Sequence, residues 1–110
     1  ITQSGETSDT LKSLERVKKE TKLPTLCITN KENSTIWEAC DYQVACYAGI
    51  ENGIAATKSF TSQMLCLILI SLKLIENLDS EVLVKNLKES LKSLPNIIEK
   101  SLNKRNEIIR

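Results

Sequence analysis

Apolar and polar positions along the chain change their spacing several times, and each change predicts a different element. Leu11, Leu14 and Val17 repeat at helical spacing after a polar pair at residues 9–10, which offers an N-cap. This pattern predicts a helix that ends near Lys22, before a proline. Short runs of apolar and β-branched residues at 23–29 and 42–48 predict two buried strands.

Between these strands, Ser34 is placed to cap a short helix over Thr35–Ala39, and a loop rich in glycine follows the second strand. A long apolar helix is predicted to begin near residues 55–57 and to continue to Leu78. Strands that alternate with helices indicate an α/β fold with a parallel sheet and helices on its faces. Since parallel sheets are covered on both faces, their strands are expected to be apolar throughout, as these are.

The pattern changes after Leu78, where leucines spaced for one helix face precede Pro95 and further apolar residues follow it (Leu83, Leu87, Leu91 and Leu94; then Ile97, Ile98 and Leu102). We expect two helices with a break at the proline. No strand remains for them to cover, so they need another partner surface. Two strands are also few, because sheets commonly have about four to six. We therefore expect at least one strand before residue 1 and a second domain after residue 110.

Composition narrows the class of protein. The 110 residues carry a net charge of +1 and only 4% aromatic residues, which disfavours a basic nucleic-acid surface or a stacking platform for single strands. C-terminal lysines alternate with glutamates and predict a solvated helix face. No signal peptide is visible, and Lys73 interrupts the apolar helix. We expect that helix to be a buried core helix of a cytoplasmic protein, not a membrane span.

The absence of histidine and the spacing of the cysteines limit the metal sites and catalytic arrangements that this chain can form. The four cysteines form no C-x-x-C pair and the chain has no histidine, so structural zinc is disfavoured and no metal is expected. Buried free thiols in a reducing compartment fit the apolar surroundings of Cys27, Cys40, Cys46 and Cys66. Without histidine, a Ser-His-Asp or Cys-His catalytic arrangement is impossible within this chain.

Two loops follow expected strand ends, where ligands bind in open α/β sheets. The first, residues 2–7, combines three hydroxyls and an amide with Gly5 and precedes a helix N-terminus. Hydroxyls, unpaired backbone N–H groups and the helix dipole suit a phosphate without any cation. The same serine and threonine side chains also suit simple helix capping, so the residues alone leave both interpretations open.

The second loop, residues 48–58, contains Gly49 and Gly53, which allow close approach to the backbone. Small or apolar residues at 54–56 would contact a polar ligand through backbone groups. Lys58 is its one cation, and it either faces a ligand or forms an ion pair with Glu51 or Glu6.

Three segments resemble sugar isomerase (SIS) domains of the glucosamine-6-phosphate synthase family. ITQSGETSDT resembles the first phosphate loop, AGIENGIAATKSFTSQ the companion loop, and LKSLPNIIEKSLNKRNEI the linker between two SIS domains. The resemblance covers essentially the whole chain. It implies a three-layer αβα, flavodoxin-like SIS fold, incomplete here, at residues 1–78, and a helical linker at residues 79–110.

The resemblance also implies a function. The family transfers ammonia from glutamine, released in a glutaminase domain, to fructose 6-phosphate, and isomerises the product to glucosamine 6-phosphate as a cytoplasmic homodimer without cofactors. Its phosphate and sugar contacts fall on Thr2, Gln3, Ser4 and Thr7, with a backbone contact at Ile54 and a serine position at Ala56. Its catalytic residues have no counterpart in this chain, so the transaminase/isomerase activity is expected of a longer protein.

Two positions depart from the family pattern. Thr2 stands where a serine is usual and keeps a hydroxyl, whereas Ala56 removes one and with it any side-chain contact to the sugar. SIS domains also sense sugar phosphates in transcription regulators, and the first loop serves that alternative equally well.

Overall fold

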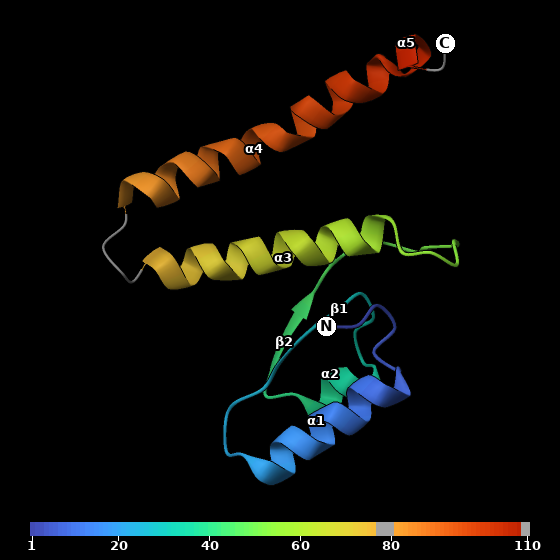
Figure 1. Cartoon of the computed structure of the whole chain (residues 1–110), viewed down its shortest axis with the longest axis vertical. Helices are drawn as coiled ribbons and strands as arrows, with labels where there is room; N and C mark the ends of the chain where they lie inside the picture. Colours follow the sequence, from blue (N-terminus) through green and yellow to red (C-terminus); the bar gives the residue numbers. More distant parts are fainter. Residues whose placement is uncertain (77–80, 109–110) are drawn as a thin grey trace. The chain divides into compact units, whose positions relative to one another are not determined.

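The computed structural model describes residues 1–76 and 81–108, and it divides the chain into two compact units, residues 1–70 and 71–110. The first unit alternates helices and strands and ends within a long helix. Its elements are, in order, α1 (Ser8–Glu20), β1 (Leu26–Thr29), α2 (Thr35–Ala39), β2 (Tyr42–Ala45) and the first part of α3 (Lys58–Ile75) (Figure 1).

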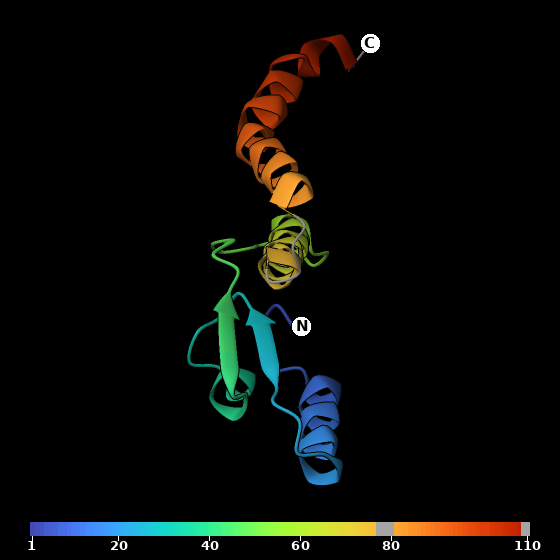
Figure 2. The ribbon, with the colours of Figure 1, turned by 90° about the vertical axis from the view of Figure 1, so that its left-hand side faces the viewer.

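β1 and β2 form a parallel pair in which Leu26 lies opposite Tyr42 and Thr29 opposite Ala45 (Figure 2). Residues 2 and 3 extend this pairing on the other edge of β1. The Thr2 N–H donates to the Ile28 carbonyl at 3.0 Å, and a parallel bridge joins Thr2 to Thr29. The predicted α/β class with a parallel sheet is therefore confirmed, and the first loop emerges directly beside the carboxyl end of β1.

A small core holds α1 and α2 against the sheet. Cys27 of β1 packs with Ile36 of α2 and with Cys40, which follows that helix. Leu11 and Leu14 of α1 and Trp37 of α2 lie against this cluster. Of the three residues whose spacing predicted α1, Leu11 and Leu14 therefore lie on its inward face, whereas Val17 is exposed. The cysteines are free thiols; Cys27, Cys40 and Cys46 are buried, as predicted, whereas Cys66 is only half-buried.

The start predicted for α1 and the cap predicted for α2 need correction. α1 begins at Ser8, with Thr7 as N-cap residue, and not after residues 9–10. α2 spans the predicted residues, but the Ser34 side chain makes no capping hydrogen bond. Both corrections involve the first loop, whose contacts are described below.

α3 is more exposed than predicted. Of its apolar side chains, Leu72 is buried, while seven others are exposed: Phe60, Met64, Leu65, Leu67, Ile68, Leu69 and Leu74. The expected buried core helix is therefore wrong for the described residues, because two strands offer too little surface to cover it. By length and mean hydropathy (1.4) alone, α3 is long and apolar enough to cross a membrane.

The second unit contains the end of α3, then α4 (Glu81–Asn103) and α5 (Arg105–Ile108). The predicted break at Pro95 is wrong: the proline lies inside α4, which continues beyond it and curves (Figure 2). A helix accommodates the missing N–H and the crowded preceding turn by bending. The predicted boundary at Leu78 lies outside the described residues.

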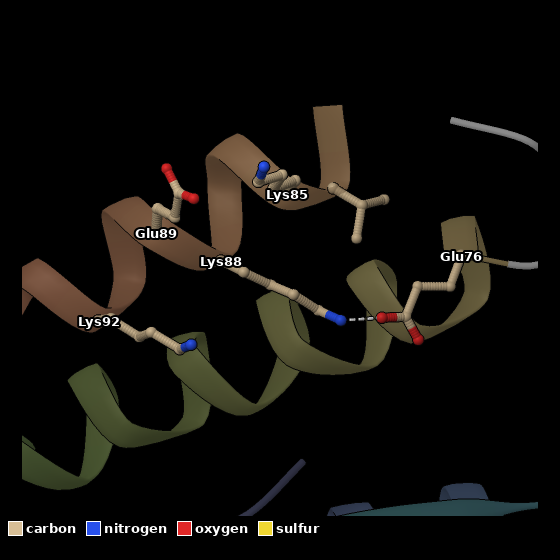
Figure 3. A pocket seen from close by; sticks show the side chains of 6 residues that line it. Glu76, Lys85, Lys88, Glu89 and Lys92 are labelled. Carbon is tan, nitrogen blue, oxygen red and sulfur yellow. Dashed lines mark hydrogen bonds and ion pairs between the residues drawn. The ribbon is translucent and has the colours of Figure 1, made fainter. Parts of the chain in front are cut away.

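The solvated face predicted for the lysines of α4 is confirmed. Lys85, Lys88, Glu89 and Lys92 are exposed and line a shallow groove beside Glu76 (Figure 3). Glu76 accepts from Lys88 and, at 2.9 Å, from Lys73. Such exposed ion pairs stabilise a fold only slightly.

Candidate functional site

The first loop, residues 2–7, lies at the carboxyl end of β1. Two hydrogen bonds to the Gln3 carbonyl fix its position. The Asn30 N–H donates to this carbonyl at 3.2 Å, and the Thr29 hydroxyl donates to it at 3.3 Å. Thr29 is fully buried. The sheet therefore holds the backbone of Gln3 and leaves its side chain exposed.

The hydroxyls of this loop gather at its centre. The Thr2 and Thr7 hydroxyl oxygens lie 3.2 Å apart, and Thr2 also accepts from the Gly5 N–H at 3.3 Å. The Ser4 hydroxyl accepts from the Glu6 N–H at 3.2 Å. A hydroxyl that accepts still has its own proton to donate. One proton of the Thr2–Thr7 pair is used within the pair, so the other hydroxyl of the pair, the Ser4 hydroxyl and the Gln3 amide keep a proton to donate.

Thr7 does not serve as a side-chain cap. It is the N-cap residue of α1, yet its hydroxyl makes no hydrogen bond to the first-turn N–H groups. The first intrahelical bond joins the Leu11 N–H to the Thr7 carbonyl at 3.0 Å, so the N–H groups of residues 8–10 have no partner within the helix. These groups and the helix dipole favour an anion next to the hydroxyl cluster.

Gly5 fits the loop tightly against α2. Its φ of +70° is disfavoured for residues with a side chain, and an added Cβ would lie 1.9 Å from the Ser34 hydroxyl oxygen. The Gly5 carbonyl accepts from the Ile36 N–H at 3.1 Å. The Ser34 hydroxyl itself is buried and has no hydrogen-bond partner within the described residues.

The Glu6 carboxylate performs the capping that Ser34 was predicted to do. It accepts from the Thr35 hydroxyl at 2.6 Å and from the Thr35 N–H at 3.0 Å. These bonds, the hydroxyl foremost, hold the pKa of Glu6 below its ordinary value. The carboxylate therefore stays ionised and engaged, which makes it unsuited to proton transfer.

In the second loop, Glu51 caps α3. Its carboxylate accepts from the Ser59 and Thr57 hydroxyls, from the Thr57 N–H at 2.7 Å and from the Lys58 N–H at 3.0 Å. The Ser59 and Thr57 hydroxyls contribute most to lowering the pKa of Glu51 to about 2.

Lys58 forms no ion pair with Glu51, with Glu6 or with any other residue in the described part of the chain. Its ammonium nitrogen lies 3.7 Å from the place where a Cβ on Gly49 would be. The ion-pair alternative for Lys58 is therefore wrong, and its side chain folds back over the start of the second loop.

Ile54 and Ala56 are exposed in the second loop. Within the described residues, no hydrogen bond joins either of them to the first loop. The structure thus joins the Thr2 and Thr7 hydroxyls within the first loop and leaves Ile54 and Ala56 exposed on the second loop.

Sequence reasoning missed Asn30. Its place directly after a predicted strand, at the edge where both loops begin, was the available signal, but an asparagine before a lysine, a glutamate and another asparagine is equally typical of a turn. Its side chain contacts the second loop while its backbone contacts the first.

Neither a metal cluster nor a free carboxylic acid is found beside these loops in the part of the chain that the structure describes. Among residues 1–76 and 81–108, no cluster of three potential metal ligands is present. Both carboxylates near the loops are ionised and bonded, so neither acts as a general acid near neutral pH.

The sequence of this chain is similar to one protein-family model and to proteins of known name. The family model described as "SIS domain" matches residues 1–72. The chain is 39% identical to glutamine–fructose-6-phosphate aminotransferase (isomerizing) of Francisella tularensis over 81% of this chain and 15% of that protein. It is 38% identical to the protein of that name from Methanosarcina mazei over 100% of this chain and 18% of that protein.

A solved structure is similar to this chain in both fold and sequence. The C-terminal domain of glucosamine-fructose-6-phosphate aminotransferase from Francisella tularensis matches with a TM-score of 0.86 and 34% identity, covering 96% of this chain and 30% of that one. These matches confirm the resemblance that the sequence motifs predicted. The chain spans about a sixth of the length of the curated relatives it matches.

Proposed function

This chain belongs to the SIS domain family, and we propose that its first loop holds the phosphate of a sugar phosphate. The observation that carries the proposal is the Thr7 hydroxyl. It lies at the N-terminus of α1 but does not cap it, and it meets the Thr2 hydroxyl at 3.2 Å beside unpaired N–H groups. Side chains whose only task was capping would be bonded to those N–H groups instead.

We assign the ligand groups as follows. The hydroxyls of Ser4 and Thr7 donate to phosphate oxygens, and the buried Thr2 hydroxyl donates to Thr7 and so orients it. The exposed amide of Gln3 donates to the phosphate or to a sugar hydroxyl. Residues 54–56 of the second loop approach the sugar, with Ile54 contributing backbone groups. Ala56 has no hydroxyl, so its contribution is limited to its backbone and methyl group.

The reaction proposed for the whole protein is that of its relatives' name, glutamine–fructose-6-phosphate aminotransferase (isomerizing). Nitrogen from glutamine is transferred to fructose 6-phosphate and the product isomerises to glucosamine 6-phosphate. In this proposal the chain is the phosphate-holding part of the isomerase half, and the groups that transfer protons lie in other parts of the protein.

The remaining parts of the proposal follow from the same family. Residues 1–78 form part of a SIS domain and residues 79–110 a linker toward a second one, in a cytoplasmic homodimer with a glutaminase domain. The family match extends through residue 72 and so includes most of α3. This supports a helix covered by other parts of a SIS fold in preference to a membrane span.

The experiment measures glucosamine 6-phosphate formed from glutamine and fructose 6-phosphate by the complete gene product. Combined Ser4→Ala and Thr7→Val substitutions each remove a charge-assisted hydrogen bond of about 1.5–3 kcal/mol, so the affinity for fructose 6-phosphate should fall at least about a hundredfold. Ser13→Ala, on the exposed face of α1, is the matched control, because its hydroxyl donates to the Asp9 carbonyl.

Unchanged affinity in the double variant would refute the phosphate loop. Binding of sugar phosphates without any turnover by the complete gene product would instead favour the regulatory alternative, a SIS-domain sensor.

A further inference from the structure

Asn30 connects the two loops at the carboxyl end of the sheet. Its backbone N–H donates to the Gln3 carbonyl at 3.2 Å in the first loop. Its side-chain amide nitrogen donates to the Gly49 carbonyl at 2.8 Å, and its side-chain oxygen accepts from the Ala48 N–H at 2.8 Å. One residue therefore contacts the first loop through its backbone and the second loop through its side chain.

The second loop is held at both ends and open between them. Asn30 holds its start, where Gly49 has a φ of +70°, and Glu51 holds its end by accepting from residues 57–59. Residues 52–56 between these contacts are exposed. Consequently, the direction in which the exposed part leaves the sheet depends on a few hydrogen bonds, and two of them come from the Asn30 amide.

We infer that Asn30 is a positioning residue that sets the second loop relative to the phosphate loop, so that one ligand can contact both. This inference rests on the proposed function. Both side-chain hydrogen bonds of Asn30 join backbone groups of the second loop. A shorter side chain at position 30 would leave these backbone groups without their partner. A ligand that contacts only the first loop would not detect the change, because the backbone bond to Gln3 remains.

The alternative is that Asn30 merely completes the turn after β1. The two roles differ in which ligands they affect. If the role of Asn30 is purely structural, its loss lowers the affinity for every ligand of the site alike, or for none. If Asn30 positions the second loop, its loss lowers the affinity only for ligands that extend beyond the phosphate. Inorganic phosphate and fructose 6-phosphate provide that contrast.

The test uses the complete gene product with Asn30→Ala. We expect the KM for fructose 6-phosphate to rise at least tenfold while the inhibition constant of inorganic phosphate stays within twofold. Asn30→Asp keeps the acceptor for the Ala48 N–H but replaces the donor to Gly49 with a carboxylate oxygen that faces the Gly49 carbonyl, so its KM should rise at least as far as that of Asn30→Ala. Asn86→Ala, on the exposed side of α4, is the matched control and should change neither value.

An unchanged KM in Asn30→Ala, or an equal loss for both ligands, overturns the inference. If Asn30→Ala does not fold, Asn30→Asp decides by the same contrast between the two ligands. These outcomes are distinct from a failure of the proposed function, in which the unsubstituted protein binds neither fructose 6-phosphate nor inorganic phosphate, and which would overturn both.

Discussion

Gly5→Ala tests whether the first loop is held by its fit against α2. A methyl group at position 5 would lie 1.9 Å from the Ser34 hydroxyl oxygen, 2.4 Å from the Ser34 Cβ and 3.2 Å from a methyl carbon of Ile36. Overpacking of this kind costs about 1–3 kcal/mol. The φ of +70° adds about 1–2 kcal/mol for a residue with a Cβ. The expected loss of stability is therefore about 2–5 kcal/mol.

Urea unfolding of the complete gene product, followed by circular dichroism, measures this loss, and hydrogen exchange of residues 34–40 localises it. Ser34→Gly, added to Gly5→Ala, removes both of the closest atoms. It should recover the stability that is lost to overpacking but not the part that is lost to the strained backbone. Ser34→Ala should restore little, because the Cβ contact at 2.4 Å remains. A loss below about 1 kcal/mol in Gly5→Ala, or no recovery with Ser34→Gly, would refute this reasoning.

Two further predictions concern helix ends and interiors. A carboxyl group whose pKa is lowered by folding stabilises the folded state at pH values above its unfolded pKa, and this contribution is lost as the pH falls. The capping of α3 by Glu51 should therefore be lost between pH 4.5 and about 2. Magnetic resonance titration should give a midpoint near pH 2, with the Thr57 and Lys58 amide shifts following it, and a midpoint near 4.5 would contradict the capping. Pro95→Ala should favour helix by about 3 kcal/mol, raising the far-ultraviolet helix signal of a peptide of residues 81–103; an unchanged signal would show that Pro95 is already accommodated without cost.

Local patterns predicted the order of elements well, because apolar spacing reflects which face of each element is covered. Leu11 and Leu14 marked the inner face of α1, and the apolar run around Cys27 marked β1. The helix caps were harder to predict. Glu6 caps α2 from 29 positions away in sequence, and no local pattern near Ser34 indicates that a distant carboxylate has taken its place.

The same limit applies to the candidate site. The hydroxyls of residues 2–7 could be identified because the residues that form the cluster are adjacent in sequence. The role proposed for Asn30 depends on three segments that meet only in the folded sheet. The ion pair predicted as one alternative for Lys58 does not form, because Glu51 instead accepts hydrogen bonds from the start of α3. Pro95 was misjudged for a different reason: a proline weakens a helix without specifying whether it ends or bends.

The first loop contains no lysine or arginine, and this has a consequence for how it selects a ligand. Charged side chains attract anions over a distance close to the Debye length, about 10 Å at 0.1 M salt, and dissolved ions weaken that attraction. Hydroxyls, amides and the first turn of a helix act mainly at contact. A loop built from them gains little from long-range steering but is also less sensitive to ionic strength. In the role proposed for it, the first loop would therefore select a phosphate by its shape and its acceptor oxygens more than by its charge alone.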